Sequence, residues 1–174
     1  MSTTAAKKPQ APEKAQTWGE KLNDKLKFSE DNRVEGRIVI KKEEMVWEDD
    51  FFVRSALVIS SMTGFKMRTL HSFIGEILPG GKTGKHRHTS EAIMLGLAGK
   101  GYTVIEGKRY DWNEGDAIVM PAMAWHQHFN ASDDTTFRYY ATSNYPLTEN
   151  LGIAFIELEE AGSHHDGGQS RHDK

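Results

Sequence analysis

Residues 80–88 read GGKTGKHRH and hold two histidines that are separated by one residue. On a β-strand, side chains two residues apart point to the same face, so His86 and His88 are expected to face one side together. The motif HQH at residues 126–128 repeats this spacing with His126 and His128. Two such pairs in one small β-fold predict a cluster of up to four imidazoles, which suit iron, zinc, copper or nickel. The alternative is that the pairs arise by chance, and the pattern around them weighs against it.

Apolar, β-branched segments recur on both sides of the histidine pairs, about 8–12 residues apart, with glycine-rich turns between them. Glu106-Gly107 is expected to be a two-residue hairpin turn. This spacing is typical of an all-β sandwich or barrel. Residues 150–160 are the one later segment expected to be helical. The expected strands are residues 37–40, 56–59, 70–78, 93–95, 102–105, 108–112, 117–120, 125–129 and 137–142.

Length and composition exclude several classes of protein. The 174 residues carry a net charge of -3 and are 37% hydrophobic, which fits one domain with polar ends. No apolar run approaches the ~20 residues of a spanning helix, and the start lacks a secretory signal, so we expect no membrane contact. The absence of cysteine excludes disulfides and thiolate chemistry and suits the cytoplasm. The sequence shows no cluster of basic residues, so we expect no nucleic-acid binding.

Three parts are expected along the chain. Residues 1–30 form a flexible N-terminal arm with one short helix, which starts at a capping box of Thr17 and Glu20 and runs through Phe28. Residues 31–161 form the β body. Residues 162–174 form a disordered, histidine-containing tail, since they show no periodicity and hold no large apolar side chain.

The spacing of glycine, proline and asparagine around both histidine pairs resembles the two motifs of the cupin family, over about residues 65–145. The first motif spans Gly80 to Gly99, with five residues between Gly80 and His86. The second begins at Gly115, reaches Pro121 after five residues and ends at Asn130. The resemblance implies a cupin jelly-roll barrel in which His86, His88 and His126 bind one metal ion.

Two positions depart from the cupin pattern. The glutamate ligand of many cupins would lie at Ala92, whereas Glu91 lies one residue earlier. A shift of one residue reverses the strand face, so Glu91 is either a metal ligand reached through a loop or a solvent-facing carboxylate. Met123 stands where most cupins have glycine.

The stretches HRHTS and WHQHFN, together with Ala92, resemble gentisate 1,2-dioxygenase and related ring-cleaving enzymes. The resemblance implies a three-histidine Fe(II) site without a glutamate ligand. Those enzymes often hold the substrate carboxylate with an arginine near the position of Met94, and methionine cannot do this. They also usually contain two cupin domains, and this chain has room for one.

Three functions are consistent with these residues. The first is an Fe(II)-dependent dioxygenase that acts on a phenolic or dihydroxy-aromatic compound with O2. The second is a non-catalytic small subunit of a two-component, hydroquinone-type dioxygenase, or a cupin that only binds a small molecule. The third is an isomerase or lyase that uses zinc, nickel or manganese without redox chemistry.

His128 is expected to share the face of His126 without binding the metal. Its imidazole, titrating near the ordinary value of ~6.5, would exchange a proton with the substrate hydroxyl. The alternative is a structural hydrogen bond. Trp112 is expected to pack in the core and Trp125 to border the pocket. His71 either faces the cavity or is an ordinary hydrogen-bonded histidine.

Assembly is expected to be a symmetric homodimer formed through strands of residues 36–60. A polar N-terminal arm would also suit docking to a larger partner subunit.

Overall fold

The computed structural model describes residues 17–31, 36–50 and 52–163. It divides into two compact units, Met1–Glu35 and Gly36–Lys174. The first contains helix α1 (Trp18–Asp31), which begins at the predicted capping box and extends three residues beyond Phe28. The Thr17 backbone N–H donates to Glu20 Oε2 over 2.7 Å, and the Glu20 N–H donates back to Thr17 Oγ1 over 3.3 Å. The predictions for residues 1–16 and 164–174 lie outside the described residues.

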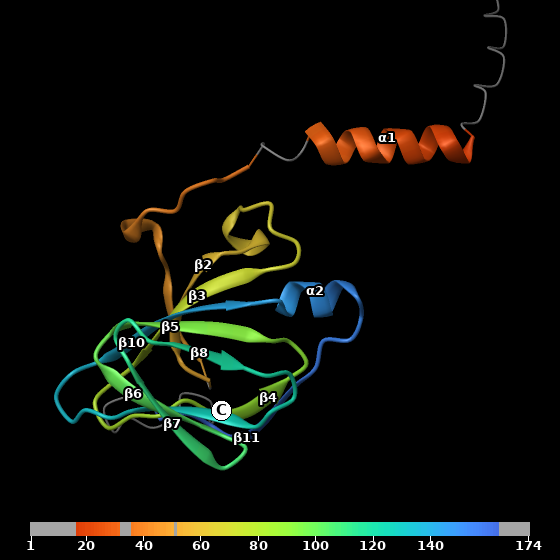
Figure 1. The fold of residues 1–174 in the computed structure, drawn as a ribbon. Helices are drawn as coiled ribbons and strands as arrows, with labels where there is room; N and C mark the ends of the chain where they lie inside the picture. The colour runs from red at the N-terminus through yellow and green to blue at the C-terminus, as the bar shows by residue number, and fades with distance from the viewer. Residues whose placement is uncertain (1–16, 32–35, 51, 164–174) are drawn as a thin grey trace, which may run out of the picture. The chain divides into compact units, whose positions relative to one another are not determined.

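The second unit consists of two antiparallel β-sheets that face each other (Figure 1). This architecture confirms the all-β class and the barrel. In spatial order, the six-stranded sheet contains β1 (Trp47–Asp49), β2 (Arg54–Ile59), β3 (His71–Ile77), β10 (Phe137–Ser143), β5 (Ala92–Ala98) and β8 (Ala117–Met120). The five-stranded sheet contains β11 (Ile156–Glu160), β4 (Lys85–His88), β9 (His126–Asn130), β6 (Lys100–Ile105) and β7 (Lys108–Asn113). Its described residues also form three short helical segments, η1 (Lys42–Glu44), η2 (Ser61–Thr63) and α2 (Tyr145–Asn150).

The core lies between the sheets, because side chains alternate between the two faces of each strand. Buried residues of β5 and β10, such as Met94, Tyr139 and Ala141, pack there against Trp112 of β7. The hairpin between β6 and β7 turns at Glu106 and Gly107, as predicted. Both have positive φ, 47° and 78°, which is the geometry of a type I′ turn.

Two predicted elements are wrong. Residues 150–160 are not a helix: α2 ends at Asn150, and β11 follows as a strand paired with β4. Ion pairs across these strands, such as Arg87 with Glu157 at 2.6 Å, stabilise the strand over local helix propensity. Residues 37–40 form no strand, because only Arg37 makes an isolated bridge, and Ile38 is left 74% exposed.

Strand register brings the histidines together. His86 of β4 is paired directly with His126 of β9, and on the other side of β9, His128 is paired with Thr103 of β6. Met123 adopts the left-handed conformation, with φ 63°, that glycine has most readily. Its N–H donates to the His88 carbonyl over 2.7 Å, which ties the turn before β9 to the end of β4.

Within the described ranges, no helix has the length and apolar character needed to cross a membrane.

Candidate metal centre

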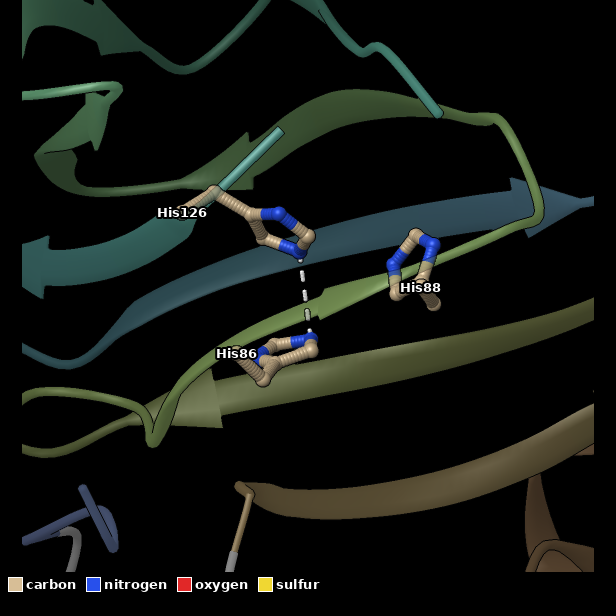
Figure 2. A group of neighbouring side chains, drawn as sticks. All are labelled: His86, His88 and His126. Carbon is tan, nitrogen blue, oxygen red and sulfur yellow. Dashed lines mark hydrogen bonds between the residues drawn. The ribbon is translucent and has the colours of Figure 1, made fainter. Parts of the chain in front are cut away.

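Three imidazole rings converge on the inner face of the five-stranded sheet (Figure 2). His86 and His88 come from β4 and His126 from β9, and one ring nitrogen of each lies within 4.8 Å of the others. The Nε2 atoms of His86 and His126 are 3.1 Å apart. The predicted same-face geometry of the His86–His88 pair therefore holds.

Backbone carbonyls fix the proton of each ring. The Nδ1 atom of His86 lies 2.9 Å from the carbonyl oxygen of Gly84, and that of His126 lies 2.8 Å from the carbonyl oxygen of Ala124. The Nδ1 atom of His88 lies 2.7 Å from the Ser90 carbonyl oxygen and 3.0 Å from the Ser90 hydroxyl. A carbonyl oxygen can only accept a hydrogen bond, so each Nδ1 carries the proton and each Nε2 keeps a free lone pair. In metal sites, hydrogen bonds of this kind to the ring nitrogen that does not bind the metal orient the histidine ligands.

Burial keeps these rings uncharged. It lowers the pKa of His86 to about 4 and that of His126 to about 3, and it also lowers the pKa of His88. The Nε2 atoms of His86 and His126 face each other across the 3.1 Å contact dashed in Figure 2, and the carbonyl at each Nδ1 leaves lone pairs there for a divalent cation. Ligand nitrogens on an ion at ~2.1 Å lie about 3.0–3.4 Å apart. The separation of these two Nε2 atoms lies in that range, and the three ligand atoms together lie within 4.8 Å of one another.

Glu91 is not brought to the three histidines. Its side chain is exposed, its backbone N–H donates to Asn144 Oδ1 over 2.8 Å, and its carboxylate accepts from Asn144 Nδ2 over 3.4 Å. The next residue, Ala92, points into the cavity and offers no ligand atom. The shift of one residue thus reversed the strand face, as the alternation of side chains requires.

His128 lies beside the cluster but is held differently. It is 4% exposed, and its Nδ1 is 2.8 Å from the hydroxyl of Thr103 instead of a carbonyl. Burial lowers its pKa well below the ordinary value, so the expectation of an unperturbed imidazole is wrong. The ring stays neutral at physiological pH.

A cavity of about 380 Å³ opens in front of the histidines. Its other walls are largely apolar, and among the described lining residues Asp50 is the one acidic side chain, with no lysine or arginine. His71 does face this cavity, where it stacks on Tyr145 with 5.9 Å between ring centroids. The apolar walls include Leu57, Phe73, Met94, Met120 and Ala141.

Sequence reasoning missed or misplaced several contributors. Trp125 is not among the residues that line the cavity. The Arg87 guanidinium instead lies over its ring, with Cζ 4.7 Å from the ring centroid. Trp112 packs in the core as expected, but its indole also hydrogen-bonds to Thr103, which had not been singled out. No local signal in the sequence marks Thr103, because it meets His128 only when β6 pairs with β9.

Comparison with known proteins was made for fold and for sequence. Residues 73–143 match the family described as the cupin domain, and the chain resembles that family over this part of the β-barrel. In fold it resembles a salicylate 1,2-dioxygenase from Pseudaminobacter salicylatoxidans, with a TM-score of 0.56 and 16% identity, covering 83% of this chain and 50% of that one. A cupin 2 conserved barrel domain protein from Salinispora arenicola has a TM-score of 0.51 and 21% identity, over 62% and 87% of the two chains.

Curated relatives point to a narrower group. A 5-aminosalicylate 1,2-dioxygenase of Comamonas is 36% identical over 75 residues, which is 43% of this chain and 20% of that protein. A gentisate 1,2-dioxygenase 1 of Aquipseudomonas alcaligenes is 36% identical over 66 residues, 37% of this chain and 19% of that protein. The matched part of this chain thus spans about a fifth of the length of these relatives.

Proposed function

We propose that this chain binds one divalent metal ion, Fe(II), through His86, His88 and His126, and uses it to oxidise or cleave a phenolic compound with O2. One observation carries the proposal: three carbonyl-fixed imidazoles direct their Nε2 lone pairs to one point at the wall of an apolar cavity. The similarity to 1,2-dioxygenases supports the choice of reaction and of iron.

A bound ion would supply Lewis-acid and redox chemistry toward a substrate hydroxyl and O2. Since all three proposed ligands are neutral, they leave the charge of the ion uncompensated. The site therefore favours an oxygen donor that carries negative charge, such as a phenolate. Three ligands also leave room at the ion for small molecules.

The cavity favours an aromatic ring without a carboxylate. Phe73, Met94 and Met120 provide apolar surface for a ring, and Met94 is 3% exposed. A carboxylate far from the metal would be desolvated beside these side chains, and none of the described lining residues is a lysine or arginine that could pair it. We therefore expect hydroquinone-like or catechol-like compounds to be better substrates than dihydroxybenzoates.

We propose that His128 lies beside the substrate hydroxyl and does not bind the metal. A general acid starts as a protonated imidazole and a general base ends as one, and burial at this position disfavours that charged form. A hydrogen bond from the neutral ring to the substrate is the role that the geometry supports.

Oxygen uptake after anaerobic Fe(II) loading tests this function. Uptake should occur with a panel of phenols and be lost in the Zn(II)-loaded chain and in His126→Ala. A chain that is silent alone and active with a larger partner would instead be the small subunit of a two-component enzyme. Turnover of a ligand by the Zn(II)-loaded chain without O2 would overturn the proposal in favour of an isomerase or lyase.

A further inference from the structure

A buried hydrogen-bond relay ends on the fourth histidine. Trp112 Nε1 donates to Thr103 Oγ1 over 2.8 Å, and Thr103 Oγ1 lies 2.8 Å from His128 Nδ1. The three residues come from β7, β6 and β9, which are neighbours in one sheet, and are 2%, 0% and 4% exposed. We call this chain of contacts the Trp112–Thr103–His128 relay.

Counting donors and acceptors gives the relay a direction. An indole N–H can only donate, so Thr103 Oγ1 accepts from Trp112 and has one proton of its own to place. Within residues 17–31, 36–50 and 52–163, that hydroxyl has no third hydrogen-bonding partner. If His128 Nδ1 were the donor, the Thr103 proton would be buried without an acceptor, which is costly. The satisfied arrangement has Thr103 donating to Nδ1.

This arrangement puts the ring proton of His128 on Nε2, the reverse of His86, His88 and His126. In those rings a carbonyl holds the proton at Nδ1 and leaves Nε2 free for a metal. The backbone of His128 is fixed as well, since its N–H donates to Thr83 Oγ1 over 2.9 Å. The ring borders the cavity, with its centroid 5.6 Å from that of His126 and 5.7 Å from that of Tyr139.

We propose that Trp112 and Thr103 are positioning residues that hold His128 in the Nε2–H tautomer, as a fixed hydrogen-bond donor to an oxygen atom of the ligand in the cavity. The same tautomer prevents His128 from becoming a fourth metal ligand, because its Nε2 has no free lone pair. The tautomer follows from the relay alone, while the effect on turnover rests on the proposed function.

Nitrogen NMR of the imidazole rings tests the tautomer without any turnover. Two-bond ¹H–¹⁵N correlations are recorded on the full chain loaded with Zn(II), which is diamagnetic, and His128→Asn assigns the His128 signals. We expect a protonated Nε2 for His128 and a protonated Nδ1 for His86, His88 and His126. A wild-type spectrum with His128 protonated at Nδ1 would overturn the proposal.

Thr103→Val and Thr103→Ser form a matched pair. Valine has the shape of threonine without the hydroxyl, whereas serine keeps the hydroxyl. We expect the valine variant to shift His128 toward Nδ1–H and to lower kcat/KM roughly tenfold, the usual size of one lost hydrogen bond, while serine retains the wild-type tautomer. An unchanged tautomer in Thr103→Val would contradict the relay. The expected tautomers with no oxygen uptake on any phenol would support the relay and refute the proposed function.

Discussion

The four clustered histidines differ mainly in what their Nδ1 atoms contact. His86, His88 and His126 each meet a backbone carbonyl, with the Ser90 hydroxyl as a second contact of His88, whereas His128 meets the Thr103 hydroxyl and no carbonyl among the described residues. Sequence spacing alone places all four on inward faces and cannot separate them. The contact partner, supplied by a neighbouring strand or turn, assigns three rings to the proposed metal and one to the ligand.

His128→Ala separates these roles. Because His128 is proposed to donate to the ligand, metal content should stay close to wild type while turnover falls about 10²–10³-fold, the usual cost of one lost donor in an active site. Steady-state kinetics and elemental analysis on the same preparation measure both. Loss of metal would make His128 a ligand, and unchanged turnover would make it structural.

Stability of the metal-free chain should fall with acidity. Burial lowers the pKa of His86 and His126 below the ordinary ~6.5, so the folded rings stay neutral while the unfolded rings take up protons. Their contribution to the free energy of unfolding is complete above pH ~6.5. It is lost as the pH falls toward the folded-state pKa, about 4 for His86 and about 3 for His126. Each contributes a slope of up to about 1.4 kcal/mol per pH unit in that window.

Urea unfolding at pH 7, 6 and 5 measures this slope. Exposed carboxylates add to it, so the comparison is with His126→Asn, which should show a smaller slope by about one proton. Equal slopes in the two proteins would show that His126 is not held neutral by the fold.

At the scale of elements, strand pairing decides what local sequence does not. The hairpin at Glu106-Gly107 and the capping box at Thr17 were predictable, because each depends on two or three adjacent residues. The strand β11 was not, because its ion pairs with β4 involve residues about 70 positions apart. Thr103 escaped notice for the same reason: it gains its role only when β6 lies against β9.

Close packing of β3 against β10 gives a prediction at this scale. A Cβ added at Gly75 would lie 2.3 Å from Tyr139 Cζ, so Gly75→Ala must displace a ring that is 1% exposed and borders the cavity. We expect a loss of about 1–3 kcal/mol in the free energy of unfolding. Gly19→Ala in α1, where the added methyl meets nothing within 4 Å, is the control. Equal stability of Gly75→Ala and wild type would refute this packing.

For the whole molecule, the symmetric homodimer through residues 36–60 stays a prediction. Strand β1 lies at the edge of the six-stranded sheet, and the segment before it exposes Val39 by 59% and Val46 by 69%. Burying such side chains against a second copy would remove apolar surface from water. Light scattering should give twice the chain mass, and Val46→Lys should halve it, whereas Ile153→Lys, on another exposed site, should not. A monomer at micromolar concentration would contradict the dimer.

The central claim is that three of the four clustered histidines bind one divalent ion. Elemental analysis of the anaerobically Fe(II)-loaded chain tests it directly, in wild type, His126→Ala and His71→Ala, since His71 borders the same cavity outside the cluster. The account predicts one ion per chain in wild type and in His71→Ala, and loss of most metal in His126→Ala while the β-sheet circular dichroism persists. Full metal occupancy in His126→Ala would contradict it.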